Sequence, residues 1–136
     1  MLPKEVYNKE QELLQYIETL GISKDKIFNK DLFLQLFVHK SYAADYKEIT
    51  DHNERLEFLG DGILGAVINK LLFVNYPEKD ESELTLYKIA LVREETLAVA
   101  AKQIGLNNQI FISKGEEKMD GRNKNAILAD CMEALL

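Results

Sequence analysis

Cysteine and proline are scarce in this chain of 136 residues, which has one cysteine, Cys131, and two prolines. A single cysteine excludes an internal disulfide and is typical of a reducing compartment, so we expect a cytoplasmic location. No apolar run is long enough to span a bilayer, and the charged first residues predict no signal peptide. The length and composition are those of a single soluble globular domain.

Positive charge is also in short supply. The 17 Lys and Arg residues are outnumbered by 23 Asp and Glu, which gives a net charge of −6. Proteins that bind a phosphate backbone use Lys and Arg to displace counterions, so this balance alone disfavours nucleic-acid binding. A cluster of acids that holds cations would remove the objection. No aromatic-rich stripe suggests stacking on single-stranded bases.

Strand patterns are almost absent, and the apolar residues repeat at helical spacing, which predicts an all-α, compact helical bundle. Gly21 and Gly105 follow helical segments as expected C-terminal caps, and Pro77 bounds a third segment. The last segment ends in Ala-Leu-Leu without a cap, so we expect a truncated helix. The expected helices cover residues 4–20, 31–44, 51–76, 82–104 and 123–136, with a polar loop over 113–125.

Residues 54–65, with the sequence ERLEFLGDGILG, combine helical spacing with three acids and three glycines. From residue 58 to 74 the helix is apolar nearly all round, which predicts a buried helix. Glu54, Glu57 and Asp61 fall within an arc of about 60° on it. Each interior glycine costs up to about 1 kcal/mol relative to alanine, so we interpret the glycines as points of close helix packing, against this chain or a partner.

A second pair of acids, Asp130 and Glu133, lies three residues apart on the last expected helix. Buried carboxylates need protons or cations, and oxygen ligands converging from two helices suit a hard cation, Mg²⁺ or Mn²⁺. Two such ions can promote phosphodiester hydrolysis. Spacing alone leaves open a capping box between Asp51 and Glu54, a solvated notch, or ordinary surface acids. A di-iron bundle is excluded because its Glu-x-x-His motifs are missing.

Four motifs resemble those of the ribonuclease III family, in order and at family spacing over residues 31–136. HNERLEFLGD at 52–61 is similar to the family signature almost letter for letter, and VHKSYA at 38–43 is similar to a second motif, with Val38 in place of the usual Thr. LVREETLA at 91–98 and NAILADCMEAL at 125–135 resemble the fourth-helix pattern and the second acidic motif. Gly62 replaces the commoner Ala, and Ser82 follows Glu81 where the family usually has Gly.

The resemblance implies an endonuclease that depends on Mg²⁺, with Mn²⁺ able to substitute, and cuts double-stranded RNA to leave 5′-phosphates and short 3′ overhangs. It implies a cytoplasmic role in RNA processing, including rRNA processing, and a homodimer in which each subunit cuts one strand. By motif position the metal ligands are Glu57, Asp61, Asp130 and Glu133, of which Asp61 and Glu133 are assigned as catalytic. Glu54 and Glu81 match two further acids of the cluster. Phe58 matches the residue that enters a socket on the partner, although a core position is the default for a lone Phe.

Lys114, Arg122 and Lys124 lie in the polar loop before the second acidic motif, which is either a solvated loop or a phosphate contact. The resemblance favours contact with duplex RNA, read by shape with little sequence preference. We expect residues 1–136 to be the catalytic domain, incomplete at its C-terminal end and without a double-stranded-RNA-binding domain. The alternatives are a catalytically inactive, ribonuclease III-like RNA-binding or ribosome-associated scaffold, and the compact type that naturally lacks the RNA-binding domain.

Overall fold

The computed structural model describes residues 2–46 and 51–136, and within these ranges the fold is all-α, as predicted. The one strand-like contact there is an isolated parallel bridge between Val38 and Phe111. The α-helices are α1 (Lys4–Asn8), α2 (Glu10–Thr19), α3 (Lys30–Gln35), α4 (Lys40–Ala44), α5 (Glu54–Asn75), α6 (Glu81–Val92), α7 (Glu94–Gln103), α8 (Lys114–Lys118) and α9 (Asn125–Leu135). Short 3-10 turns are η1 (Lys24–Lys26), η2 (Leu106–Asn108) and η3 (Gly121–Asn123).

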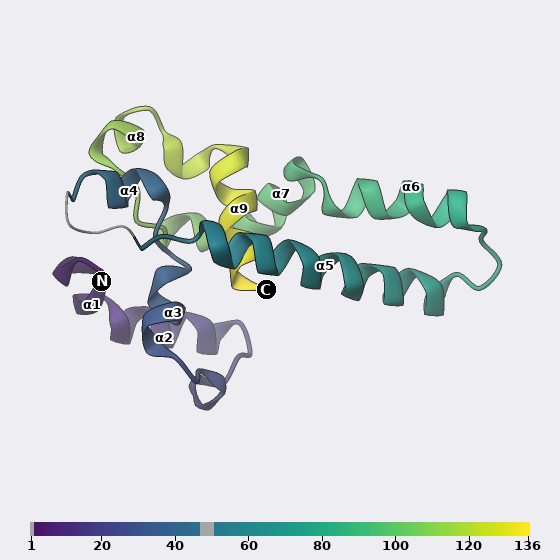
Figure 1. The fold of residues 1–136 in the computed structure, drawn as a ribbon, viewed down its shortest axis with the longest axis horizontal. Coiled ribbons are helices and arrows are strands. Elements are labelled where there is room, and N and C mark those ends of the chain that lie inside the picture. Colours follow the sequence, from purple (N-terminus) through teal and green to yellow (C-terminus); the bar gives the residue numbers. More distant parts are fainter. Residues whose placement is uncertain (1, 47–50) are drawn as a thin grey trace.

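The molecule has two parts, a compact body and a helical hairpin that projects from it. Helices α5 and α6 lie antiparallel and extend to one side, as Figure 1 shows. Helix α9 packs against the first part of α5 and against α7, so it joins the hairpin to the body. The two acidic motifs, one on α5 and one on α9, therefore meet at the base of the hairpin.

The body has one hydrophobic core, to which the N-terminal helices, α7 and α9 all contribute. Tyr16 on α2 donates a hydrogen bond from its hydroxyl to the Ile104 carbonyl oxygen at 2.8 Å, which ties α2 to the end of α7. Cys131 is fully buried, with its sulfur 3.4 Å from the Leu36 carbonyl oxygen. Fully buried apolar side chains include Phe37, Leu13, Ile17, Leu34, Leu106, Leu128 and Val6.

Three of the expected helices are interrupted. The first breaks at Lys9 and the fourth at Arg93, whose extended backbone (ψ 158°) turns the chain from the hairpin back to the body. The second breaks because the backbone pairs elsewhere: His39 N–H donates to the Phe111 carbonyl at 3.0 Å, and Phe111 N–H donates to the Phe37 carbonyl at 2.8 Å. Apolar periodicity continues through each break and so gave no signal of it.

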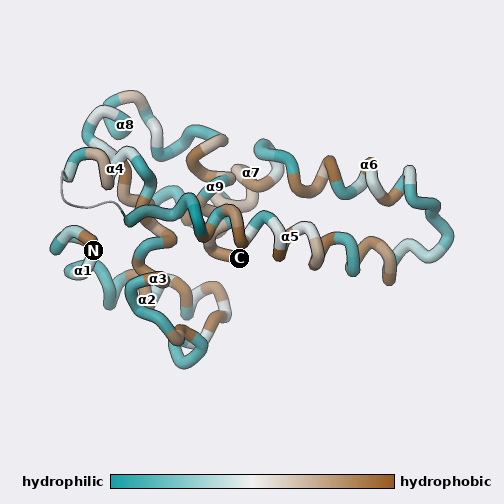
Figure 2. The backbone as a smooth tube through the Cα atoms, in the orientation of Figure 1, coloured by the Kyte–Doolittle hydropathy of each residue, from teal (hydrophilic) through white to brown (hydrophobic). Residues whose placement is uncertain are grey.

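Helix α5 begins at Glu54 and ends at Asn75, close to the predicted bounds, but the prediction that it is buried is wrong for the single chain. Among the described residues, α6 is the helix that packs along α5 beyond the crossing with α9, and Figure 2 shows apolar residues along both helices of the hairpin. The exposed large apolar residues of α5 are Phe58, Leu59, Ile63, Val67, Leu71, Phe73 and Val74. Its hydrophobicity is therefore not explained by packing within one chain.

The predicted helix ends at Gly21 and Gly105 are confirmed, since both glycines adopt the left-handed conformation, with φ of 83° and 73°. The loop over 113–125 is not simply extended, because it contains α8 and η3. In residues 2–46 and 51–136 no helix is both long and apolar enough to cross a membrane.

Candidate active site

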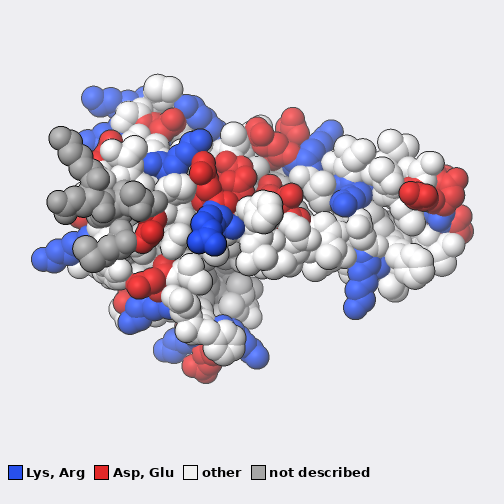
Figure 3. Space-filling view, in the orientation of Figure 1, with Lys and Arg blue, Asp and Glu red and all other residues white. Residues whose placement is uncertain are grey.

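The two acidic motifs meet where α5 and α9 cross, and the crossing depends on Gly60. This glycine is buried, and a Cβ atom placed on it would overlap the carbonyl oxygen of Glu133. The backbones of the two helices therefore touch directly. Because residues 57 and 61 flank Gly60, and 130 and 133 lie on the facing side of α9, the close contact brings four carboxyl groups together. Figure 3 shows acidic side chains gathered at this junction.

Each carboxyl group of α5 pairs with one of α9. A side-chain hydrogen bond between Glu57 and Asp130 contributes to the raised pKa of Glu57, and one between Glu133 and Asp61 contributes to the raised pKa of Glu133. The structure thus places the four acids at one junction, as two pairs between the helices. The pairs are mixed between helices, so neither motif can form the cluster by itself.

Burial and mutual repulsion both favour the protonated forms of these acids. Burial, then the neighbouring Asp130 charge, raises the pKa of Glu57 to about 7. Burial, then the Asp61 charge, raises the pKa of Glu133 to about 7. Burial also raises the pKa of Asp130. Near neutral pH the cluster therefore holds shared protons that a cation could replace.

Glu54 lies at the first residue of α5, on the rim of the cluster. Its carboxylate is 3.4 Å from the ammonium of Lys40, the first residue of α4, and its charge contributes to the raised pKa of Glu57. The capping box considered between Asp51 and Glu54 does not form the helix start, because Asn53 is the N-cap residue. The Glu54 N–H instead points to His52 Nδ1 at 3.4 Å.

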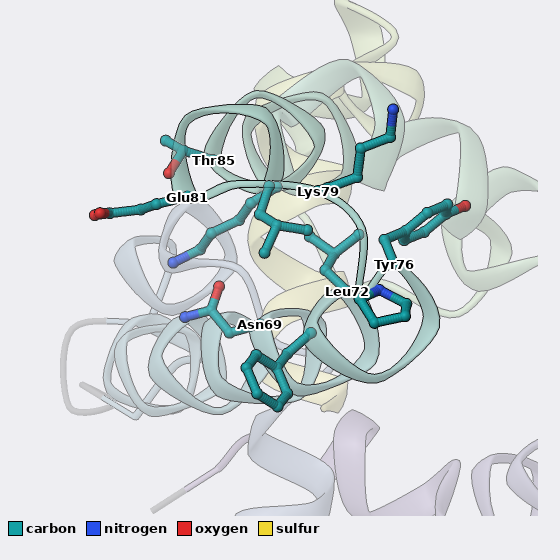
Figure 4. Close-up of a pocket in the computed structure, with 10 residues that line it drawn as sticks. Asn69, Leu72, Tyr76, Lys79, Glu81 and Thr85 are labelled. Atoms are coloured by element: carbon teal, nitrogen blue, oxygen red, sulfur yellow. The ribbon is translucent and has the colours of Figure 1, made fainter.

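Glu81 is the one predicted acid that a single chain does not bring to the cluster. It is the first residue of α6, at the tip of the hairpin, and lines a cavity there with Asn69 and Thr85 (Figure 4). The 22 residues of α5 separate that tip from Glu54 by about 30 Å. A capping box does occur at this tip, between Asp80 and Glu83, with side-chain bonds of 2.9 and 3.1 Å.

Phe58 is 83% exposed, so the core position that is the default for a phenylalanine does not apply in the single chain. It projects from α5 beside a cavity of about 960 Å³ between α5 and α3, whose lining includes Leu32, Leu56 and Leu59. An exposed aromatic side chain next to a hollow that leucines help to line is suited to a self-complementary contact.

The three cationic residues predicted to contact RNA differ in their surroundings. Lys114 is exposed at the start of α8. Lys124 pairs with Glu116 at 2.9 Å. Arg122 uses its guanidinium inside the loop: it binds the Glu117 carboxylate and donates to the carbonyls of Asn107 at 3.0 Å and Ile110 at 2.7 Å. The geometry of Arg122 is that of a residue that holds the loop together.

Asn53 and Lys40 are two neighbours of the cluster whose roles sequence reasoning missed. Asn53 is buried, and its side chain donates to the Leu36 carbonyl at 3.1 Å while its N–H donates to the Val38 carbonyl at 2.9 Å. These bonds fix the start of α5 on the body. The polar residue directly before the acidic helix was the available signal. For Lys40 the sequence offered no signal, because its partner Glu54 lies on another helix, beyond the segment that joins α4 to α5.

The donor set of the cluster fits a hard divalent cation, since all four groups are carboxyls. Among residues 2–46 and 51–136, however, no three acidic, His or Cys side chains are already arranged around one metal position. Instead, each carboxyl group of α5 interacts with one carboxyl group of α9. Loss of the shared protons would turn these hydrogen bonds into repulsions that a cation can relieve.

The comparison with protein families is decisive. The model of the family described as Ribonuclease-III-like matches residues 29–136, which includes every motif discussed above. The chain belongs to the ribonuclease III family. Proteins named Ribonuclease 3 are similar to it: that of Borreliella afzelii is 39% identical over 128 residues, 94% of this chain and 51% of that protein. That of Natranaerobius thermophilus is 40% identical over 126 residues, 93% of this chain and 53% of that protein.

Solved ribonuclease III structures share the fold. A nuclease domain of the Campylobacter jejuni ribonuclease III, described as flexible in a region involved in dimer formation, matches with a TM-score of 0.78 and 33% identity over 89% of this chain and 79% of that chain. A second structure of the same domain gives a TM-score of 0.74 over 92% of this chain and 78% of that chain. This ribonuclease III family chain spans about half the length of the curated relatives it matches.

The carboxyl pairs predict an unusual pH dependence of stability in the absence of divalent metal. The pKa of Glu57 and of Glu133 in the folded state is about 7, above the ordinary value of 4.5. Between these two pH values the folded state therefore binds more protons than the unfolded state. Their contribution to stability is complete below the ordinary pKa and is lost as pH rises through about 7. In EDTA we expect the Tm to fall between about pH 5 and pH 8.

Thermal unfolding followed by circular dichroism in EDTA checks this expectation. The double variant Glu57→Gln, Glu133→Gln is the control, because glutamine keeps the shape and cannot titrate, and its Tm should change less over the same interval. A wild-type Tm that rises across the interval would contradict the assignment of protons to these pairs.

Proposed function

We propose that this chain is the catalytic part of a ribonuclease III that cuts double-stranded RNA with divalent metal ions. The observation that carries the proposal is the meeting of Glu57 and Asp61 with Asp130 and Glu133 at a backbone-to-backbone helix crossing. Membership of the ribonuclease III family supports the reaction class. All four acids are present, and no observation favours an inactive scaffold.

Glu57, Asp61, Asp130 and Glu133 would hold the metal, Mg²⁺ or Mn²⁺. A divalent cation there would activate water and stabilise the leaving oxygen of the phosphodiester. The residues of the chain prepare this site: the α5–α9 crossing holds the four carboxyls in a cluster, and burial favours the protonated forms of Glu57 and Glu133, so a bound cation would take the place of protons. Asp61 and Glu133 are our candidates for the catalytic pair.

RNA would approach the cluster across the rim that carries Glu54 and Lys40. On the α8 side, Lys114 would offer its exposed ammonium group to a phosphate, Lys124 would do so by exchanging Glu116 for a phosphate, and Arg122 supports the loop that carries them. Contacts of this kind supply affinity without reading sequence. We propose products with 5′-phosphates and short 3′ overhangs, as in RNA and rRNA processing in the cytoplasm.

A homodimer would explain the exposed apolar face of α5. We propose that Phe58 of each subunit enters the cavity beside α3 on its partner. The same dimer would bring Glu81, which lies far from the acidic cluster of its own subunit, near an acid of the partner. Two copies would then present two active sites to the two strands of one duplex.

Phe58→Ala tests the dimer contact. A central aromatic anchor in an interface contributes about 2 kcal/mol or more, so we expect the dimer dissociation constant to rise about 30-fold or more. Sedimentation over a dilution series measures it. Phe28→Ala is the matched control, because Phe28 is 96% exposed and lies outside the residues lining the cavity. A Phe58→Ala protein as fully dimeric as the control would remove Phe58 from the interface.

The activity is tested by incubating a long, perfectly paired RNA with the chain in Mg²⁺ and mapping the product ends. EDTA and Asp61→Asn are the controls. We expect metal-dependent cuts that leave 5′-phosphates and short 3′ overhangs and that disappear in both controls. Absence of cleavage by a folded dimer saturated with Mg²⁺ would refute the proposed activity.

A further inference from the structure

A groove extends from the acidic cluster along one side of the hairpin. Two adjoining cavities form it, of about 380 Å³ near Asp61 and about 680 Å³ near the tip, and they share two lining residues from opposite helices, Asn69 and Lys88. We call this feature the hairpin groove. Its residues are Asp61, Gly62, Gly65, Asn69, Thr85 and Lys88.

Two glycines keep the inner half of the hairpin groove open. A Cβ atom on Gly62 would meet nothing within 4 Å. A Cβ atom on Gly65 would lie 3.6 Å from the Lys88 ammonium nitrogen, so that nitrogen sits over the backbone of α5 at Gly65. Residue 65 is one helical turn beyond Asp61, about 6 Å along the axis. A cation is thus placed one turn from a carboxylate of the proposed active site.

Lys88 is the lysine of this groove that is available to a ligand. Within the part of the chain that the structure describes it has no ion pair, whereas Lys79, which also lines the outer cavity, pairs with Glu83 at 3.8 Å. In Figure 4, Lys79 lies on the opposite side of the hairpin from Asn69 and Thr85. Two acids face the groove, Asp61 at its inner end and Glu81 at its outer end.

We propose that the hairpin groove holds the sugar–phosphate backbone of RNA beside the cleavage site, with Lys88 contacting a phosphate one helical turn from Asp61. The inference rests on the proposed function. An unpaired ammonium attracts phosphate, and the amide of Asn69 and the hydroxyl of Thr85 can each bond a 2′-hydroxyl, the group that distinguishes RNA from DNA. Glu81 repels phosphate at the tip, so the phosphate contact is confined to the part of the groove around Lys88.

The test compares Lys88→Gln, Lys88→Arg and the control Lys70→Gln. Lys70 is an exposed lysine of α5 placed about 180° around the helix from Asp61. Affinity for a short RNA duplex is measured against salt concentration in the Asp61→Asn background, which binds without cutting. We expect Lys88→Gln to bind about tenfold more weakly, with a salt slope reduced by about one. Lys88→Arg should restore the affinity, and Lys70→Gln should match the parent.

Cleavage by the same variants with Asp61 intact supplies a second readout. Lys88→Gln should raise KM with little change in kcat, because a contact away from the scissile bond contributes uniform binding. A salt slope for Lys88→Gln equal to that of Lys70→Gln, in a protein that binds and cuts, would overturn the groove proposal and leave the proposed function standing. A change confined to the dimer dissociation constant would overturn it in favour of a second copy of the chain. Failure of the unmodified chain to bind or cut duplex RNA would refute both.

Discussion

Gly60→Ala should destabilise the fold by about 3 kcal/mol and reduce RNA cleavage at least about a hundredfold. The added methyl group would overlap the carbonyl oxygen of Glu133, which is backbone and cannot rotate away. Helices α5 and α9 must then separate. Because the carboxyl pairs span this crossing, the separation moves Asp130 and Glu133 away from Glu57 and Asp61. Urea unfolding followed by circular dichroism measures the first effect, and duplex cleavage the second.

Gly62→Ala is the matched control for stability, since it makes the same change two residues further along the same helix. A Cβ atom there meets no other atom within 4 Å. Alanine is favoured over glycine in a helix interior, so this variant should be more stable by up to about 1 kcal/mol. If Gly60→Ala were as stable as Gly62→Ala, the direct contact between the two helices would not exist.

Glu133→Gln should lower kcat for RNA cleavage about a thousandfold and leave the Kd for duplex RNA within about twofold. Glutamine keeps the length of the side chain and can still donate to Asp61, so the crossing stays intact. It removes a negative charge that the proposed metal needs, and several kcal/mol of transition-state stabilisation depend on that metal. In the proposed complex, duplex RNA would contact cations on the rim, which the variant leaves unchanged.

For Glu133→Gln, the cleavage rate is measured under single-turnover conditions and the Kd for duplex RNA is measured in the same buffer. Glu95→Gln on α7 is the control, because Glu95 is an exposed acid outside the cluster and its loss changes the net charge equally. Normal cleavage by Glu133→Gln would remove Glu133 from the site. Equal loss of binding and cleavage would instead assign Glu133 to holding RNA.

The sequence predicted the fold class and the long acidic helix well because these depend on local signals. Gly21 and Gly105 end helices through their own left-handed backbone, and Pro77 lies just beyond α5. The breaks at Lys9 and Arg93 were missed because the apolar spacing continues through both. The break between α3 and α4 depends on Phe111, more than seventy residues away along the chain.

The site shows the same division between local and distant causes. Spacing placed Glu57 with Asp61 and Asp130 with Glu133, and the two pairs do meet. It could not reveal that the backbones touch at Gly60, because that contact involves a residue on another helix. The charge of Arg122 was equally compatible with RNA and with the loop's own carbonyl groups, and the geometry favours the latter.

The exposed apolar face of α5 shows where hydrophobic patterning misleads. A helix apolar on all sides predicts burial, yet Phe58 and Phe73 are 83% and 74% exposed. Hydrophobic patterning reflects what the chain buries in its working assembly, and among the described residues of a single copy α6 and α9 make most of the helix contacts of α5. The proposed homodimer would supply further surface.

The order of the acidic motifs along the chain has a consequence for synthesis on the ribosome. Residues 57 and 61 leave the exit tunnel about seventy residues before 130 and 133, and each carboxyl pair needs one member from each group. A nascent chain that has emerged only as far as α8 therefore carries half of the cluster. On the proposed function, the growing polypeptide would be unable to cut the RNA around it until α9 docks across Gly60.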